Sequence, residues 1–256
     1  MKAVKGLILR DKNAILEALR TGREIYYIGV SRGIKDDKKI SEILAIAEKK
    51  NISIKELTRT NNNASRKTIS IEAKCGDFKY SSFDNLKEVI ERKGSEALLV
   101  AIDHVQDPRN LGAILRTAAA AGVDAVIIEK RRCCEVTDIA YETSCGGADR
   151  IPVVKVSNLR QTLRVFKEWG CWIAGTDERA EDSCYNVDLS GLNVLVLGSE
   201  GEGLSRIVSE ECDFIVRIPT APNFPSLNVS VAAGIMMFEF VRAKLMNMAG
   251  NTEQAE

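Results

Sequence analysis

Residues 97–122 read ALLVAIDHVQDPRNLGAILRTAAAAG, and this stretch decides the class of fold. Its first seven residues are almost all apolar, which predicts a buried strand over 97–103. Asp107 followed by Pro108 predicts the start of a helix, because aspartate caps helices and proline suits the first turn. Apolar residues then recur at helical spacing until Gly122 ends the helix: Leu111, Ile114, Leu115 and Ala118. A buried strand that leads into an amphipathic helix indicates an α/β fold.

The same alternation continues toward the C-terminus. Further apolar strands, separated by helical stretches, are predicted at 125–129, 172–176, 194–199 and 214–218. Near-continuous apolar strands that alternate with helices are typical of a parallel sheet covered on both faces. On the helix after Pro108, Ala113 and Ala120 lie beside Arg116 and leave little bulk on that face. A second backbone or subunit could therefore approach this helix closely.

The first 94 residues predict a smaller α/β unit. Helices are expected at 11–20, 39–50 and 83–93, and strands at 24–31, 52–57 and 68–73. Residues 58–67 contain three consecutive asparagines and are a loop by composition. Gly94 ends the last of these helices, and the rhythm changes to buried strands from Glu96 onward. We therefore expect a first domain over 1–94 and a second over 95–256.

Charge is distributed unevenly between these two parts. The whole chain is neutral, with 36 Lys and Arg against 36 Asp and Glu. Residues 1–94 hold 21 of the basic and 13 of the acidic residues, a net charge of +8, which leaves 15 and 23, or −8, for the rest. Such asymmetry suggests contact between the basic part and a nucleic acid. A solvated basic surface explains the charge equally well.

Several classes of protein have little support in the composition. The chain has one histidine, His104, and no Cys-x-x-Cys motif, so neither a zinc site nor a Ser–His–Asp triad is expected. We therefore expect no metal. The seven cysteines include the adjacent pair Cys133 and Cys134, and they fit reduced thiols in the cytosol better than a disulfide framework. The apolar runs are too short to cross a membrane.

Three stretches rich in glycine and polar residues, 103–116, 197–204 and 218–230, follow predicted strands, where ligands bind in open α/β sheets. The second, LGSEGEGL, taken alone indicates a tight turn, and its spacing is not the Gly-x-Gly-x-x-Gly of dinucleotide-binding folds. A nicotinamide-dependent oxidoreductase is therefore a weak alternative. Asn110, Arg116 and Asn228 could each be a helix cap or a solvated side chain. Glu200, however, sits inside the glycine loop, where a plain turn does not need it.

Together the three stretches resemble the motifs of the SpoU family of SPOUT methyltransferases. The first matches Asp-Pro-x-Asn-Leu-Gly-x-x-x-Arg over 107–116, and the second matches Gly-x-Glu-Gly-x-Gly over 198–203. The third matches Ser-Leu-Asn-Val-Ser-Val-Ala over 226–232. The resemblance covers about residues 96–245, and the motifs are specific as a set. The first domain more weakly resembles the family's ribosomal-protein-like substrate-binding domain.

The chain departs from its relatives at three places. It has Lys-Thr-Ile at 67–69, where close relatives carry a His-Gln-Gly turn. Relatives often have glycine at the position of His104 and within the loop that here reads Pro-Asn-Phe-Pro at 222–225. These differences bear on the RNA contacts more than on the catalytic core.

The resemblance implies a parallel-sheet α/β domain with a C-terminal trefoil knot, preceded by a small α/β substrate-binding domain. It implies S-adenosylmethionine as the methyl donor and RNA as the partner, with methylation of a ribose 2′-hydroxyl, most simply of a guanosine in 23S rRNA. The residues expected to bind the cofactor are Gly198, Ile218, Ser226 and Leu227. The expected catalytic residues are Asn110, Arg116, Glu200 and Asn228.

Arginine stays protonated at neutral pH, so we expect Arg116 to clamp phosphate and ribose, and Glu200 is the candidate proton acceptor. The last helix fits the homodimer that the family forms. Its small-residue face holds Ser226, Ser230, Ala233 and Gly234, and its bulky face holds Val231, Ile235 and Phe238. A tRNA methyltransferase, an antibiotic-resistance rRNA methylase and a non-catalytic RNA-binding relative remain as alternatives.

Overall fold

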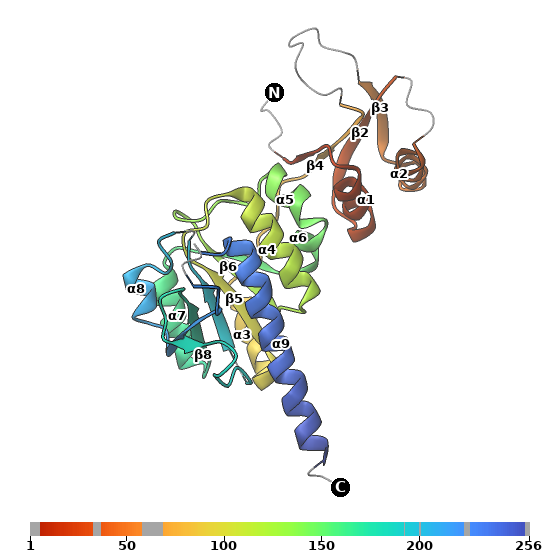
Figure 1. Ribbon diagram of the computed structural model, residues 1–256. Coiled ribbons are helices and arrows are strands. Elements are labelled where there is room, and N and C mark those ends of the chain that lie inside the picture. Colours follow the sequence, from red (N-terminus) through yellow and green to blue (C-terminus); the bar gives the residue numbers. More distant parts are fainter. Residues whose placement is uncertain are drawn as a thin grey trace.

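Two sheets organise the chain (Figure 1). The computed structural model describes residues 6–32, 37–57, 69–191, 193–199, 201–222 and 226–253. The smaller sheet belongs to the N-terminal part and the larger one to the C-terminal part, which confirms the predicted α/β fold with two units. The loop predicted at 58–67 and most of the unusual residues at 67–69 and 222–225 lie outside the described residues.

The smaller sheet has the strand order β1-β4-β2-β3. Its unit consists of β1 (Ile8–Leu9), α1 (Lys12–Thr21), β2 (Ile25–Ser31), α2 (Lys38–Lys49), β3 (Ser53–Leu57) and β4 (Ile71–Cys75). Strand β2 pairs parallel with β3 and antiparallel with β4. Both helices begin where an aspartate, Asp11 or Asp37, accepts hydrogen bonds from backbone N–H groups of the first turn. The predicted elements are confirmed here, with β4 displaced toward Cys75 by its pairing with β2.

The larger sheet has the order β7-β6-β5-β10-β8-β11-β9, and all its neighbouring strands are parallel. Its strands are β5 (Leu98–Ile102), β6 (Ala125–Glu129), β7 (Val153–Val156), β8 (Trp172–Thr176), β9 (Asp182–Ser183), β10 (Asn193–Leu197) and β11 (Phe214–Arg217). Its helices are α3 (Asp84–Lys93), a 3-10 turn η1 (Gly94–Glu96), α4 (Pro108–Ala120), α5 (Asp138–Ser144), α6 (Gly147–Arg150), α7 (Leu159–Glu168), α8 (Arg206–Ser209) and α9 (Val229–Glu253). The five predicted strands are confirmed. The sequence does not predict β7 and β9, because both are short and β9 exists through its pairing with β11.

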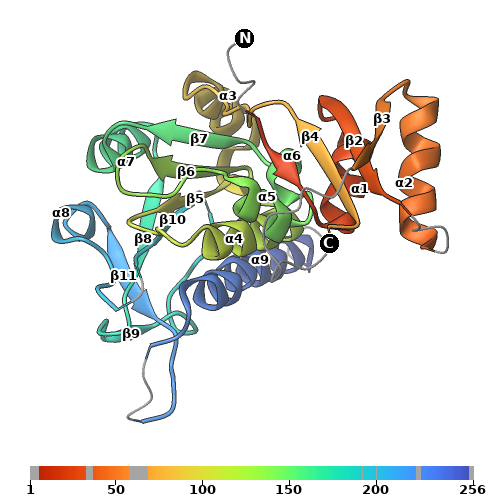
Figure 2. The same cartoon turned by 90° about the horizontal axis from the view of Figure 1, so that it is seen from above.

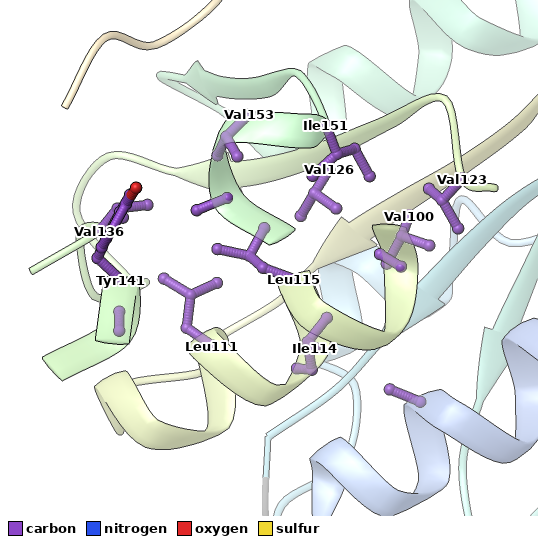
Figure 3. Packing of buried hydrophobic residues seen from close by; sticks show 14 of the residues in the cluster. Val100, Leu111, Ile114, Leu115, Val123, Val126, Val136, Tyr141, Ile151 and Val153 are labelled. Carbon is purple, nitrogen blue, oxygen red and sulfur yellow. The ribbon is translucent and has the colours of Figure 1, made fainter. Parts of the chain in front are cut away.

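Helices cover both faces of the larger sheet, as its apolar strands predict. Successive residues of a strand point to opposite faces, so Val100 joins one hydrophobic core and Leu99 the other. The first core takes in α4, α5 and α9 and continues into the N-terminal unit, and the second takes in α3, α7 and α8. Figure 3 shows the first core around Leu111, Leu115 and Tyr141.

Helix α4 forms as its sequence predicts. Asp107 is the N-cap, and its Oδ1 accepts a hydrogen bond from the Arg109 N–H at 2.8 Å. The apolar stripe from Leu111 to Ala118 is buried. Helix α9 lies beside α4 (Figure 2), and a Cβ placed on Gly234 would lie 3.5 Å from Thr117 Cγ2. Helix α9 therefore packs against α4 at Thr117, while Arg116 and Ala120 of the low-bulk face stay exposed.

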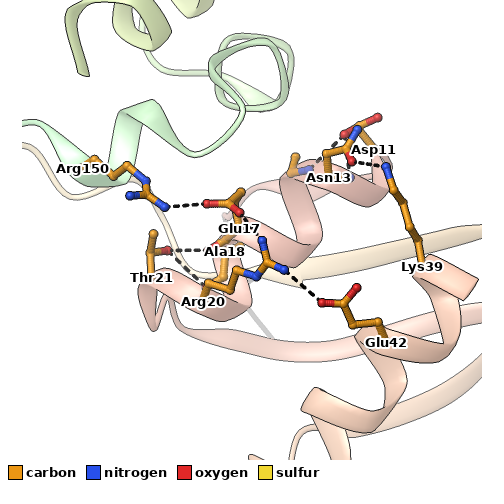
Figure 4. A network of polar contacts seen from close by, with 10 residues as sticks. Asp11, Asn13, Glu17, Ala18, Arg20, Thr21, Lys39, Glu42 and Arg150 are labelled. Carbon is orange, nitrogen blue, oxygen red and sulfur yellow. Dashed lines mark hydrogen bonds and ion pairs between the residues drawn. The ribbon is translucent and has the colours of Figure 1, made fainter. Parts of the chain in front are cut away.

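The N-terminal unit rests on α5 and α6. Arg23 forms an ion pair with Asp149 at 2.7 Å, both side chains are largely buried, and the Tyr141 hydroxyl also donates to Asp149. A neighbouring network crosses the same boundary, where Glu17 of α1 accepts a hydrogen bond from Arg150 of α6 (Figure 4). These contacts join the two units through charged groups as well as through the shared core.

The division of the chain at residue 94 stays a prediction. Helix α3 lies before this point, yet Leu86 and Ile90 belong to the second core of the larger sheet. Ser81 also forms a parallel bridge with Val154 of β7. This packing favours a boundary that lies before α3.

Candidate active site

The three stretches singled out in the sequence meet at one edge of the larger sheet. Strands β5 and β10 are parallel neighbours with Ile102 opposite Leu197, so the residues that follow them leave the sheet side by side. Strand β8 pairs with β10 and with β11 in the same direction. The carboxyl ends of parallel strands form the usual ligand site of open α/β sheets. The segments after β5, β8, β10 and β11 therefore surround one region.

The glycine loop after β10 folds back on itself as a tight hairpin. The N–H of Ser199 donates to the carbonyl of Gly203 at 3.0 Å, and the Gly203 N–H returns a hydrogen bond to Ser199 at 3.2 Å. A Cβ at position 198 would lie 2.2 Å from the carbonyl carbon of Gly203, so only glycine fits at Gly198. The loop thus presents backbone at the sheet edge, where a ligand can approach it closely.

A pocket opens between this loop and the segment that follows β11. Its walls include the four residues expected to bind the cofactor: Gly198, Ile218, Ser226 and Leu227. Apolar side chains complete one part of the wall, and Asp177, Arg179 and Arg217 bring charges of both signs to another. The pocket therefore suits a ligand that has both an apolar part and charged groups.

Thr176, the last residue of β8, and residues 177–179, which follow β8, also line this pocket, and the sequence motifs do not single them out. Arg179 Nη2 donates to the carbonyl of Glu202 at 3.0 Å, and Arg179 Nε donates to Asp177 Oδ1 at 3.2 Å. Arg179 thereby ties the segment after β8 to the glycine loop. The signal that could have found these residues is their position after a predicted strand of the same sheet.

A second hollow lies next to this pocket. Its walls include His104, Asp107, Asn110 and Glu202. Ser199 and Val229 line both hollows, so two ligands could meet between these residues.

Asn110 and Asn228, from the first and third motifs, are in direct contact at this place. Asn228 Nδ2 donates to Asn110 Oδ1 at 3.1 Å. Asn228 Oδ1 accepts from the Ser230 N–H at 3.0 Å and so caps α9. The helix-cap interpretation of Asn228 is therefore correct. The same side chain also contacts Asn110, which lines the second hollow.

Arg116 and Glu200 are placed differently. Arg116 is exposed on α4, about 9 Å along the helix axis from Asn110. Its Nη1 contacts Cys145 Sγ at 3.4 Å, and it is not among the wall residues of either hollow in the described part of the chain. Glu200 lies outside the described residues. The roles of both side chains stay predictions.

Two thiols lie close behind the first motif. Cys133 Sγ donates a hydrogen bond to the carbonyl of Ile102 at 3.2 Å. Burial raises the pKa of Cys133, and it raises the pKa of Cys134 to about 11. Both thiols are therefore protonated at neutral pH and are poor nucleophiles. Nitrogen and oxygen groups, rather than these two thiols, are therefore the candidates for catalysis at this site.

The described residues contain no group of three or more His, Cys, Asp or Glu side chains that could hold a metal ion. The seven cysteines, all of which are described, are free thiols. No helix in the described part of the chain has the length and apolar character needed to cross a membrane.

Comparison with known proteins agrees with this geometry. Residues 97–238 match the SpoU rRNA Methylase family, and residues 12–66 match the RNA 2′-O ribose methyltransferase substrate binding domain. The chain is 34% identical over 235 residues to YacO of Bacillus subtilis (strain 168), named as a TrmH family tRNA/rRNA methyltransferase, with 91% of this chain and 94% of YacO covered. It is 37% identical over 240 residues to a Staphylococcus aureus (strain MSSA476) protein named in the same way, with 93% and 96% covered.

The fold is shared with a solved structure. The AdoMet-bound rRNA methyltransferase from Sinorhizobium meliloti superposes with a TM-score of 0.73 at 24% identity, and the match covers 93% of this chain and 87% of that one. AdoMet is S-adenosylmethionine, the methyl donor that the sequence motifs imply. The chain therefore belongs to the SpoU family of S-adenosylmethionine-dependent RNA 2′-O-ribose methyltransferases and carries the family's substrate-binding domain at its N-terminal side.

Proposed function

We propose that the chain methylates the ribose 2′-hydroxyl of a guanosine in 23S rRNA. The pair of hollows with common walls at Ser199 and Val229 supports methyl transfer between two ligands, and the choice of a 23S rRNA guanosine follows from the family resemblance. One hollow would hold the methyl donor and the other the nucleotide. Holding both reactants in one place supplies much of the rate gain in a displacement reaction.

The first pocket fits S-adenosylmethionine by the chemistry of its walls. Gly198 lines this pocket, and it lets the hairpin close tightly because a Cβ at this position has no room beside the Gly203 backbone. Ile218 and Leu227 offer apolar contacts to an adenine ring, and Asp177 and Arg179 offer opposite charges to an amino group and a carboxylate. When bound, the cofactor supplies an electrophilic methyl group on a sulfonium sulfur.

The N-terminal unit is the proposed holder of the RNA. Its net charge of +8 over residues 1–94 favours contact with phosphates. The contact between Glu17 and Arg150 sets this unit against α6. Cys145, which contacts Arg116, lies in the short segment between α5 and α6. An RNA held by the N-terminal unit would therefore lie on the side of the protein where Arg116 is exposed.

Arg116 is proposed to clamp the RNA rather than to remove a proton. A guanidinium group stays protonated at neutral pH, and its positive charge favours the negative charge that develops on the ribose oxygen. Glu200 is a candidate proton acceptor by its position in the chain, since its neighbours Ser199 and Gly201 line the cofactor pocket.

We further propose that two copies pair through α9. Val231, Phe238 and Leu245 follow each other at intervals of seven residues and are 51%, 49% and 62% exposed. Residues seven apart lie on one face of a helix, so these side chains form an apolar stripe. A second copy is the proposed occupant, because the resemblance to the SpoU family implies a homodimer.

The dimer can be tested by light scattering during size-exclusion chromatography. Phe238→Asp places a charge in the stripe and should give a monomer of about half the mass. Tyr185→Asp is the matched control, because Tyr185 is 53% exposed and lies outside α9. A dimer that survives Phe238→Asp with unchanged dissociation would contradict pairing through this stripe.

The substrate is decided by mapping 2′-O-methyl groups in RNA from cells with and without the gene. Loss of one guanosine methyl group from 23S rRNA supports the proposal. Loss from a tRNA, or at an antibiotic-binding nucleotide of rRNA, assigns one of the alternative substrates. Unchanged RNA together with RNA binding would favour a non-catalytic RNA-binding protein.

A further inference from the structure

The turn after β6 carries three consecutive basic residues. Lys130, Arg131 and Arg132 directly follow Glu129, the last residue of β6, and all three are exposed. We call these three residues the basic turn. Residues 95–256 as a whole carry a net charge of −8. The basic turn is therefore a positive patch on an otherwise acidic part of the chain.

Most lysines and arginines of residues 95–256 are paired with carboxylates, but the basic turn is not. Those with an ion pair include Arg150, Arg160, Arg164, Lys167, Arg206 and Arg242. Lys130 and Arg131 form no ion pair within the part of the chain that the structure describes, and Arg132 approaches Glu129 only at 4.0 Å. Their charges are therefore available to an anion from outside the protein.

The acidic groups near the basic turn are already engaged. Glu135, which follows in the same loop, forms an ion pair with Lys155, and the Lys155 Nζ also lies 4.5 Å from the centre of the Tyr80 ring. The side chain of Glu129 is 12% exposed. Asp107, on the neighbouring segment, caps α4. Acidic neighbours therefore do not balance the positive charge that the basic turn presents to solvent.

Backbone hydrogen bonds fix the basic turn beside the second hollow. The Lys130 N–H donates to the carbonyl of Val156, the last residue of β7, at 2.9 Å. A few residues later, the Cys134 N–H donates to the carbonyl of Val105 at 2.9 Å. Val105 lines the second hollow. The backbone of this segment is thus ordered before a ligand arrives, which lowers the entropy lost on binding.

The same segment also contacts the N-terminal unit. Asp138, the first residue of α5, accepts a hydrogen bond from the Ile8 N–H of β1 at 3.0 Å. Figure 1 shows α5 next to the N-terminal unit. Residues 130–138 therefore border both the second hollow and the unit that is the proposed holder of the RNA.

We propose that the basic turn binds phosphates of the substrate RNA close to the nucleotide that enters the second hollow. This inference rests on the proposed function of that hollow as the nucleotide site. Arginine and lysine bind phosphate by charge, and arginine adds paired hydrogen bonds. Residues 130–137 contain no aromatic side chain on which a base could stack. The basic turn therefore positions the RNA backbone and does not read its sequence.

RNA binding by the double variant Lys130→Gln/Arg131→Gln tests this proposal. Fluorescence anisotropy with a short, labelled single-stranded RNA measures the Kd of the full-length protein over a range of salt concentrations. Loss of two exposed charge contacts should raise the Kd by about 2- to 30-fold at low salt. The plot of log association constant against log salt should become less steep by about 1.4, because each phosphate contact on a single strand contributes about 0.7. RNAs of different sequence should be affected alike.

The matched control removes the same two kinds of charge from α3. Lys87 is 56% exposed and Arg92 is exposed, and α3 leads into the amino end of β5, opposite the edge that carries the hollows. Lys87→Gln/Arg92→Gln should keep the Kd and the salt dependence of the wild type. An unchanged salt dependence for Lys130→Gln/Arg131→Gln in a folded protein would overturn the proposal and leave another anion, such as an acidic protein surface, as the partner. Equal flattening by the control would overturn it too.

Methyl-transfer kinetics separate this proposal from the proposed function. The KM for RNA should rise in Lys130→Gln/Arg131→Gln while kcat stays within about twofold, because phosphate contacts stabilise the ground state and the transition state alike. A lower kcat with an unchanged KM would contradict a role in RNA positioning. A wild-type protein that methylates RNA, together with an unchanged salt dependence in the variant, overturns the role of the basic turn alone. A wild-type protein that methylates no RNA refutes the proposed function, and with it the place of the basic turn in the reaction.

Discussion

Gly198→Ala tests whether the glycine loop forms the cofactor pocket. The added methyl would lie 2.2 Å from the carbonyl carbon of Gly203, 2.4 Å from its oxygen and 2.5 Å from the backbone nitrogen of Leu204. All three atoms are backbone, so no side chain can turn aside and the hairpin between 199 and 203 must open. Overpacking of this kind costs about 1–3 kcal/mol. If this cost destabilises only the conformation that binds the cofactor, the Kd for S-adenosylmethionine rises by about 5- to 150-fold.

Isothermal titration calorimetry with S-adenosylmethionine measures this change, and thermal unfolding shows whether the variant still folds. Gly234→Ala is the matched control, because its new Cβ would meet Thr117 Cγ2 at an ordinary 3.5 Å. The control should bind the cofactor as the wild type does. A Gly198→Ala protein that is folded and binds S-adenosylmethionine within about twofold of wild type would refute the reasoning, because a shift large enough to relieve these contacts cannot leave the pocket wall in place.

Arg116→Ala should abolish methyl transfer and leave the Kd for S-adenosylmethionine within a few-fold, and an equal loss of cofactor binding in calorimetry would show that Arg116 does not serve the RNA side. Glu200→Gln should lower kcat strongly only if Glu200 accepts the proton, so a rate close to wild type at every pH assayed removes it from the chemistry. Hydrogen bonds from Arg164 and Arg160 lower the pKa of Glu211 from 4.5 to about 2. The stability that Glu211 contributes is therefore complete above its ordinary pKa and is lost as the pH falls toward 2. Glu211→Gln should lower the free energy of unfolding by about 1 kcal/mol at neutral pH, a modest figure because both arginines are partly exposed, and the difference should vanish in acid denaturation curves.

The sequence by itself determined the layers of the larger unit and the place of its site. The apolar run of β5 and the Asp107 cap of α4 are local signals, because they depend on residues within one turn or one strand of each other. Because the strands are parallel, the segments that follow them leave the sheet at the same carboxyl edge. These segments are 103–116, 197–204 and 218–230. The short strands β7 and β9 escape detection, since a strand of two to four residues is held by its neighbours more than by its own pattern. The trefoil knot is implied by membership of the SpoU family, and no periodicity in the chain predicts it.

Only the tertiary structure decided which side chains meet. The bond between Asn110 and Asn228 joins residues 118 positions apart, and Arg179 reaches the carbonyl of Glu202 from the segment after β8, which the motifs do not mark. The sequence likewise cannot show that His104 is left-handed or that Asp103, its neighbour in the chain, is fixed by the backbone of Ser205. Hydrophobic periodicity and capping act over a few residues, whereas the chemistry of a site depends on contacts between segments that only the folded sheet brings together.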